Sequence, residues 1–232
     1  MNPIFVAIDT NDVHRAAALV RDLGGQIGGV KLGLEFFCAH GADGVIRVAE
    51  HEMPVFLDLK LHDIPNTVRK AVRALAPLEP TVLTVHAAGG KAMLAAAKEA
   101  APPRTKVVAV TVLTSLDQDD LNSIGVRASP EHQVERLTEL AREAGVDGIV
   151  CSGAEVAAAK TLWPEGFFVV PGIRPAGSDV ADQKRVVTPR QAIDDGASIL
   201  VVGRPITEAV RPAKAAADIV ASLQRAHEEV RP

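Results

Sequence analysis

Short apolar runs rich in β-branched residues alternate along this chain with longer Ala- and Leu-rich stretches that have helical spacing. Such alternation is typical of repeated βα units that build a parallel sheet. Eight units in 232 residues predict a compact α/β fold, a (β/α)₈ TIM barrel. An open doubly wound sheet stays the alternative, because a count of strands does not prove that the sheet closes. The expected strands are 3–8, 27–32, 53–58, 80–85, 106–111, 147–150, 167–170 and 198–202.

No linker or low-complexity tract interrupts the chain, so residues 1–232 are expected to form a single domain. Pro65 suits the first turn of a helix, and Gly145 suits the end of another. The connections 114–130 and 171–188 are long for a compact fold, and the second has the glycines and prolines of a lid. The expected helices are 11–23, 41–51, 65–76, 90–100, 131–144, 153–161, 189–195 and 212–227.

The composition argues against several classes of protein. A net charge of −4, a pI near 6.0 and only 3% aromatic residues disfavour a nucleic-acid binder. The apolar runs are shorter than the roughly 18 residues of a membrane span, and the first is too short for a signal peptide. Cys38 and Cys151 give neither a disulfide framework nor a metal pair, so a cytoplasmic protein is expected. The histidine spacing does not suit zinc.

The strongest candidate for chemistry is the stretch 58–63, Asp-Leu-Lys-Leu-His-Asp, which follows the apolar run of the third expected strand. A buried parallel strand should stay apolar to its end. Residues two apart on a strand share a direction, so Asp58 and Lys60 should lie side by side, with Asp63 beyond them at a turn. These charges cost desolvation free energy unless they are paired or used. By themselves they fit a structural salt bridge as well as a catalytic site.

Polar residues also follow the other expected strands, where a TIM barrel carries its active site. The loops after the seventh and eighth strands often bind phosphate in this fold. Here they contain Gly172 with Arg174, and Gly203 with Arg204, which could offer backbone N–H groups and guanidinium groups to an anion. Gln183 could donate an amide N–H from the lid-like loop. The alternative is that these are turn glycines with solvated arginines.

Several polar residues are expected to have structural roles instead. The run 151–153, Cys-Ser-Gly, resembles a nucleophile turn, but its spacing provides no base, so Cys151 should be buried and inert. His62 and His86 lie near strand ends and are expected to make supporting hydrogen bonds. The acidic run 117–120 resembles the charged start of a helix rather than a metal site.

The ten residues 58–67, Asp-Leu-Lys-Leu-His-Asp-Ile-Pro-Asn-Thr, resemble the signature of the orotidine 5′-phosphate decarboxylase family. The resemblance covers most of the chain, and every position that the family needs matches. The other matching stretches, in the family's order, are Ala-Ile-Asp at 7–9, Val-Lys-Leu-Gly at 30–33, Val-Thr-Val-Leu-Thr-Ser at 110–115, Pro-Gly-Ile-Arg-Pro at 171–175, Asp-Gln-Lys-Arg at 182–185 and Val-Gly-Arg-Pro-Ile at 202–206.

The resemblance implies a homodimeric barrel that decarboxylates orotidine 5′-monophosphate to uridine 5′-monophosphate and carbon dioxide, the last step of de novo pyrimidine synthesis. It implies no metal and no organic cofactor. The implied catalytic residues are Lys31, Asp58, Lys60 and Asp63, of which Asp63 would act in the neighbouring subunit's site. The implied substrate-binding residues are Asp9 and Lys31 at the ribose, Ile64 and Thr67 from the neighbour, Thr114 at the pyrimidine, and Pro171, Arg174, Gln183, Gly203 and Arg204 around the phosphate.

The implied reaction needs such a set of charges. Loss of carbon dioxide from C6 leaves a carbanion-like centre in the ring plane, where the π system cannot delocalise it. The Lys60 ammonium would stabilise this centre and then protonate it. Asp58 would lie beside the substrate carboxylate, where like charges disfavour the ground state. The flanking carboxylates would keep Lys60 charged.

Two other functions stay open. Related barrel enzymes, such as keto-gulonate-phosphate decarboxylases and hexulose-phosphate synthases, use D-x-K-x-x-D with magnesium on a sugar phosphate. The continuation 64–67 and the loop with Gln183 favour the nucleotide enzyme. A non-catalytic nucleotide-binding barrel is the second alternative, but a binder would not need so costly a cluster of charges.

Overall fold

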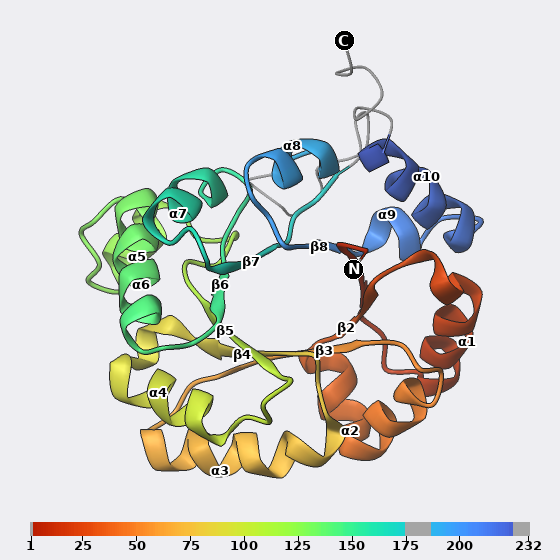
Figure 1. Ribbon diagram of the computed structural model, residues 1–232, viewed down its shortest axis with the longest axis horizontal. Coiled ribbons are helices and arrows are strands. Elements are labelled where there is room, and N and C mark those ends of the chain that lie inside the picture. Colours follow the sequence, from red (N-terminus) through yellow and green to blue (C-terminus); the bar gives the residue numbers. More distant parts are fainter. Residues whose placement is uncertain (1, 175–186, 225–232) are drawn as a thin grey trace.

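The computed structural model is a closed barrel of eight parallel strands, which confirms the predicted TIM barrel and excludes the open sheet (Figure 1). The structure describes residues 2–174 and 187–224. Each strand pairs with the next, and β8 returns to pair with β1. The strands are β1 Ile4–Ile8, β2 Gly29–Leu32, β3 Val55–Leu61, β4 Val82–His86, β5 Lys106–Val110, β6 Gly148–Val150, β7 Phe167–Val170 and β8 Ile199–Val202.

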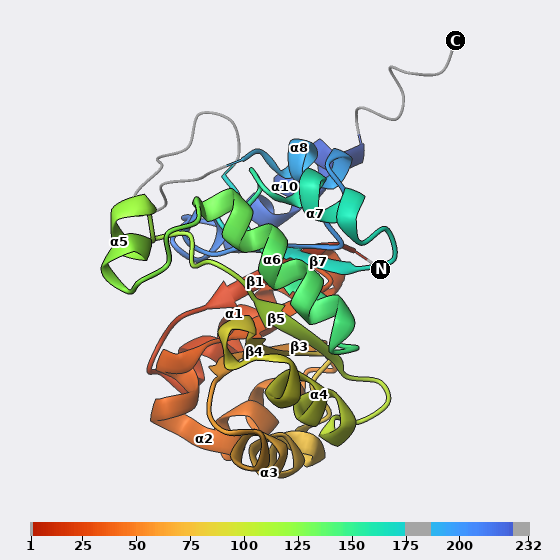
Figure 2. The same ribbon diagram turned by 90° about the vertical axis from the view of Figure 1, so that its left-hand side faces the viewer.

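Helices ring the barrel and cover its outer face (Figure 1). Eight of them overlap the predicted stretches. Figure 2, which views the molecule from the side, places α5 beyond the end of the barrel. Among the described residues, the helices are too short or too polar to span a membrane. They are α1 Val13–Leu23, α2 Leu34–Ala49, α3 Pro65–Leu75, α4 Lys91–Ala100, α5 Gln118–Ser123, α6 Pro130–Glu143, α7 Val156–Leu162, α8 Pro189–Asp194, α9 Arg204–Thr207 and α10 Pro212–Gln224, with 3₁₀ turns η1 Gly24–Gln26, η2 Ala76–Leu78 and η3 Ala87–Gly89.

Three helical elements differ from the prediction. α2 begins at Leu34 rather than at residue 41, and Gly41, at φ 57°, kinks it at the position where the helix was predicted to begin. α5 lies inside the connection that was expected to be a loop, although its acidic start was predicted correctly. Asp117 caps it and accepts from the backbone N–H of Asp120, whose side chain accepts from Asp117 in return. The short α9 follows β8 directly and was not predicted.

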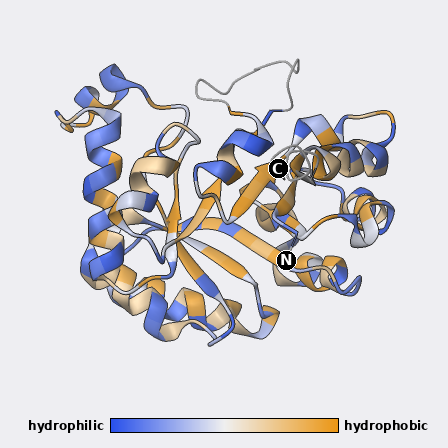
Figure 3. Ribbon diagram, turned by 45° about the horizontal axis from the view of Figure 1, so that its top comes forward, coloured by the Kyte–Doolittle hydropathy of each residue, from blue (hydrophilic) through white to orange (hydrophobic). Residues whose placement is uncertain are grey.

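Hydrophobic side chains fill the inside of the barrel and the space between the strands and the helices. The strands of the barrel are accordingly coloured mostly as hydrophobic in Figure 3. The inner cluster consists mainly of strand residues, among them Phe5, Phe56 and Val108. A Cβ at Gly29 would collide with the Phe5 ring and with Pro54 O, so the absence of a side chain there lets Phe5 enter the barrel. Each fully buried residue of this size contributes roughly 1.5–3 kcal/mol of transfer free energy. The packed interior leaves the polar groups at the strand ends.

Candidate active site

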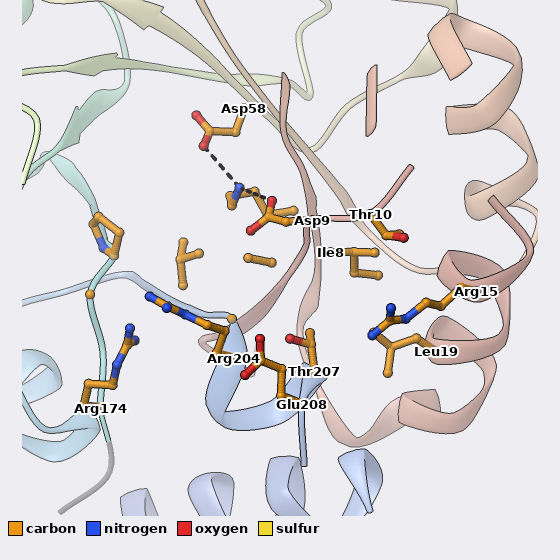
Figure 4. Close-up of a pocket in the computed structure, with 16 residues that line it drawn as sticks. Ile8, Asp9, Thr10, Arg15, Leu19, Asp58, Arg174, Arg204, Thr207 and Glu208 are labelled. Carbon is orange, nitrogen blue, oxygen red and sulfur yellow. Dashed lines mark ion pairs between the residues drawn. The ribbon is translucent and has the colours of Figure 1, made fainter. Parts of the chain in front are cut away.

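A row of four charged side chains crosses the carboxyl ends of β1, β2 and β3. Lys31 Nζ lies 3.6 Å from Asp9 Oδ1 and 3.3 Å from Asp58 Oδ2 (Figure 4). Lys60 Nζ lies 2.8 Å from the same Asp58 oxygen. Lys31 and Asp58 are nearly buried, with side chains 12% and 13% exposed, whereas Asp9 is 58% exposed. The predicted neighbourhood of Asp58 and Lys60 is therefore confirmed, and Asp9 and Lys31 extend it.

Asp58 is the electrostatic centre of this row. Burial raises the pKa of its carboxyl, but the charges of Lys31 and Lys60 oppose that effect. Hydrogen bonds from Lys60 and Thr84 add to them, and the net result is a pKa below the ordinary value. Asp58 is therefore ionised at neutral pH, with a lysine ammonium on either side.

The end of β3 is irregular where the charges lie. Lys60 has φ 49°, in the left-handed region that side chains disfavour, and the pairing register with β4 shifts between Leu57 and Leu61. The expected side-by-side contact is present, but it does not arise from a regular strand. Strained backbone of this kind costs on the order of 1–3 kcal/mol and is found most often at functional sites.

Thr84 supports this irregular backbone and was missed by sequence reasoning. Its hydroxyl oxygen accepts from the Lys60 N–H at 2.8 Å, and the hydroxyl donates to Asp58 Oδ1 at 3.0 Å. Thr84 is fully buried in β4. The sequence did contain a signal, because Thr84 lies within the apolar run 82–85. The hydroxyl of a threonine in a buried strand needs a hydrogen-bond partner.

Two cavities meet at the charged row. The larger, of about 520 Å³, is polar, and it is faced by Arg174 from the loop after β7 and by Arg204 from the start of α9 (Figure 4). The smaller, of about 150 Å³, runs into the barrel between apolar side chains and reaches Lys60 and Thr114. Both cavities are lined by Lys31, Asp58, Pro171 and Val201, and the larger one also by Asp9 and Gly203.

The loop after β7 is fixed where the structure describes it. The Arg174 N–H donates to Val187 O at 3.0 Å, and a β-bridge joins Ile173 to Val187, so both ends of the connection are held together. Gly172, at φ 74°, makes the turn that a side chain would disfavour. The lid interpretation and Gln183 fall on residues 175–186, which lie outside the described residues.

Three of the predicted site residues are not brought to these cavities. Asp63, Ile64 and Thr67 lie at the start of α3 with exposed side chains, and Ile64 is 66% exposed. Asp63 Oδ1 accepts from the Ile64 N–H at 2.7 Å. Cys151, in contrast, is 1% exposed and lines the smaller cavity, so its predicted burial is confirmed.

The fold and site define a class: a TIM-barrel enzyme with a lysine–carboxylate array beside a cavity suited to a phosphorylated substrate. The model of the orotidine 5′-phosphate decarboxylase / HUMPS family matches residues 2–219, and the chain belongs to this family. It is 61% identical over 222 residues to an orotidine 5′-phosphate decarboxylase from Sphingopyxis alaskensis, covering 96% of this chain and 99% of the relative.

Two further comparisons agree with this membership. The chain is 60% identical to an orotidine 5′-phosphate decarboxylase from Erythrobacter litoralis, with 96% of this chain and 99% of the relative covered. The crystal structure of orotidine 5′-phosphate decarboxylase from Lactobacillus acidophilus superposes with a TM-score of 0.85 at 36% identity. That superposition covers 96% of this chain and 99% of the other.

Proposed function

We propose that this chain converts orotidine 5′-monophosphate to uridine 5′-monophosphate and carbon dioxide, the last step of de novo pyrimidine synthesis. The observation that carries the proposal is the row from Asp9 to Lys60 at the junction of a polar and an apolar cavity. A nucleotide suits both kinds of cavity, because its phosphate is charged and the two faces of its flat base can pack against apolar side chains. Relatives about 60% identical carry this activity in their names.

The two cavities suggest how the nucleotide binds. The phosphate lies in the larger cavity, where Arg174 and Arg204 donate to it together with backbone N–H groups near Gly203. The ribose lies beside Asp9 and Lys31, whose polar atoms can bond its hydroxyls. The base enters the smaller cavity toward Thr114. The site then holds C6 of the base near Lys60.

The chemistry follows from the charges. The bond between C6 and the carboxylate breaks, its electron pair stays on C6, and carbon dioxide leaves. The Lys60 ammonium stabilises the negative charge and then gives C6 a proton. Asp58 stays ionised because of its lowered pKa, so it repels the substrate carboxylate while it holds both lysines. The reaction uses neither a metal nor an organic cofactor, because Lys60 supplies both the charge and the proton.

The proposed enzyme is a homodimer with shared active sites. Asp63 and Ile64 project from the start of α3 and stay outside their own chain's cavities. Ile64 is an exposed isoleucine beside the Asp63 carboxylate, and a second subunit could bury it. Asp63 and Thr67 would then complete the active site of that second subunit. Both cysteines are free thiols, which suits the reducing cytoplasm as the location.

Sharing of the site can be tested by mixing two inactive variants. In a hybrid of Lys60→Ala and Asp63→Ala chains, one site combines an intact Lys60 with an intact Asp63. Activity should therefore recover after subunit exchange, which mass spectrometry of differently tagged chains can verify. Exchange without recovery of activity would mean that each site is built within one chain.

The reaction itself is tested by following the ultraviolet absorbance after addition of orotidine 5′-monophosphate, with and without a chelator. We expect complete conversion to uridine 5′-monophosphate at the same rate in both samples. Binding of uridine 5′-monophosphate without turnover would instead support a non-catalytic barrel. Loss of activity with the chelator would support the metal-dependent sugar-phosphate enzymes.

A further inference from the structure

Two histidines pack against each other directly behind the charged row. His62 lies in the signature between Lys60 and Asp63, and His86 is the last residue of β4. Their rings are stacked, with centroids 5.4 Å apart and an angle of 18° between the planes. Gly89 also packs against His62, because a Cβ there would lie 3.2 Å from His62 Cδ2. The His62 ring therefore has a defined place although much of the residue is exposed.

His86 is the fixed member of the pair. It is paired with Val110 of β5 in the barrel sheet. Its Nδ1 accepts from the Ala88 N–H at 3.4 Å, which is possible only when that nitrogen carries no proton. The hydrogen bond, although long, thus favours the neutral ring with its proton on Nε2. His86 can serve as a platform because its own position is set by the sheet and by η3.

The surroundings also favour a neutral His86. Burial is the largest cause that lowers its pKa, followed by the charges of His62 and Lys60 on β3. β5 presents the uncharged Val110 beside it. The neighbouring α4 lysines are occupied by carboxylates, Lys91 by Glu143 and Lys98 by Asp147. A proton on either imidazole would therefore bring a second positive charge close to the Lys60 ammonium.

We propose that His86 is a positioning residue: by stacking on His62, it fixes the chain between Lys60 and Asp63 and so directs Asp63 toward the neighbouring subunit's site. This inference rests on the proposed function. β4 supports the end of β3 at two successive points, with Thr84 at Lys60 and His86 at His62. Among the described residues, the hydrogen bond that holds the Asp63 side chain is the one from the neighbouring Ile64 N–H. The direction of the Asp63 side chain therefore depends on the stack of His62 on His86.

The first test separates the ring from its charge. His86→Ala removes the ring and should lower kcat by between about 10- and 100-fold, the usual cost of a misplaced catalytic group. His86→Phe keeps a flat ring without a titratable nitrogen, so it should retain most of kcat at neutral pH. It should also lose less activity than the wild type in acid, at pH values below the ordinary histidine pKa of about 6.5, because the pKa of His86 is lowered by burial and by the charges of His62 and Lys60. His132→Ala, on the exposed face of α6, is the control.

Two results of this first test would overturn the proposal. They are a wild-type kcat for His86→Ala, and a pH profile of His86→Phe that superposes on that of the wild type. Circular dichroism establishes that each variant is folded. The His86→Phe profile keeps the test decisive if His86→Ala fails to fold.

The second test asks which site His86 serves. In a hybrid of His86→Ala and Lys60→Ala chains, the site with an intact Lys60 receives Asp63 from a chain whose histidine stack is intact. We expect the activity of a hybrid between wild type and Lys60→Ala. A hybrid as slow as His86→Ala itself would mean that His86 serves the active site of its own chain, which contradicts the proposal. A wild-type protein without any decarboxylation would instead contradict the proposed function.

Discussion

Within the described part of the chain, two carboxylates are each paired with two lysines, and these two clusters lie at opposite ends of the barrel. Asp58 lies between Lys31 and Lys60 at the carboxyl end of β3. Asp147 precedes β6 at the opposite end, with Lys98 Nζ at 2.6 Å and Lys106 Nζ at 3.3 Å. Both carboxylate side chains are 13% exposed, and the pKa of each is lowered below its ordinary value. Charge and burial of the carboxylate alone therefore do not distinguish the two clusters.

Their surroundings do distinguish them. Asp147 Oδ2 also accepts from the Val107 N–H at 2.9 Å, and its lysines are 34% and 51% exposed. The cluster joins α4, β5 and β6 as a structural clamp. At Asp58 one lysine is nearly buried, the other has a left-handed backbone, and two cavities adjoin. Desolvation, backbone strain and access to a ligand are thus what separate the proposed catalytic cluster from the structural one.

The largest difference between the clusters is expected when each loses one lysine. Lys60→Ala should lower kcat by at least about 10³-fold, because the C6 carbanion loses its neighbouring ammonium. Lys98→Ala, the matched change at Asp147, should leave kcat unchanged. Steady-state decarboxylation assays on folded variants measure both effects. Near-normal turnover by Lys60→Ala would contradict its role.

A smaller and different effect is expected from an exposed cation of the site. Arg204→Ala should weaken binding of uridine 5′-monophosphate by on the order of 10- to 100-fold, because it removes charge-assisted hydrogen bonds to the phosphate. Binding of uridine, which has no phosphate, should not change. Calorimetric titration of both ligands measures this difference. Equal affinities of the nucleotide for wild type and variant would mean that the phosphate binds elsewhere.

Thr84→Val tests whether the hydroxyl that contacts Asp58 contributes to activity as well as to stability, unlike a buried hydroxyl elsewhere in the barrel. The change leaves the Lys60 N–H and Asp58 Oδ1 without this partner and should destabilise the fold by about 1–3 kcal/mol. It should also lower kcat, since Lys60 is less firmly held. Thr105→Val, which removes a hydrogen bond to Pro80 O at 2.7 Å, is the control for stability without activity. Urea unfolding measures the stability of both variants, and kinetic assays measure their kcat. If Thr84→Val, like Thr105→Val, kept the wild-type kcat, the role of Thr84 would be structural only.

The smallest effect is expected at the structural cluster. Burial raises the pKa of Asp147, but hydrogen bonds from Lys98 and the Val107 N–H, and the charges of Lys98 and Lys106, lower it below its ordinary value. The ionised form therefore stabilises the fold above the unfolded-state pKa of about 3.9, and this contribution is lost as the pH falls through the folded-state value.

Asp147→Asn should accordingly cost no more than about 1 kcal/mol at neutral pH, because both lysines are partly exposed to solvent. Its deficit relative to the wild type should shrink below about pH 4. Urea unfolding across this pH range provides the measurement. A deficit that stays constant into acid would show that charge pairing is not its source.

The strands and the charged end of β3 were predictable because both are local in sequence. Apolar runs mark buried strands directly, and charges after such a run stand out. Arg174 and Arg204 could be assigned to one cavity because the barrel fixes where the loops after neighbouring strands meet. The position of the candidate site was thus predictable wherever fold geometry brings the ends of strands together.

Tertiary contacts account for what could not be predicted. Lys98, Lys106 and Asp147 meet only because α4, β5 and β6 pack together, and the sequence contains no motif that joins them. Thr84 looks like any strand threonine until β3 deviates from regular pairing beside it. The left-handed conformation of Lys60 had no local signal, because lysine is not a residue that favours positive φ.

The left-handed conformation of Lys60 lowers the stability of the fold at the residue to which we assign the chemistry. Glycine adopts φ 49° without the steric cost that lysine bears, roughly 1–2 kcal/mol. Lys60→Gly would relieve that backbone strain, but it would also remove the ion pair to Asp58 and the ammonium to which we assign the chemistry. Thermostable versions of this enzyme should be sought by changing residues elsewhere, with Lys60 held constant.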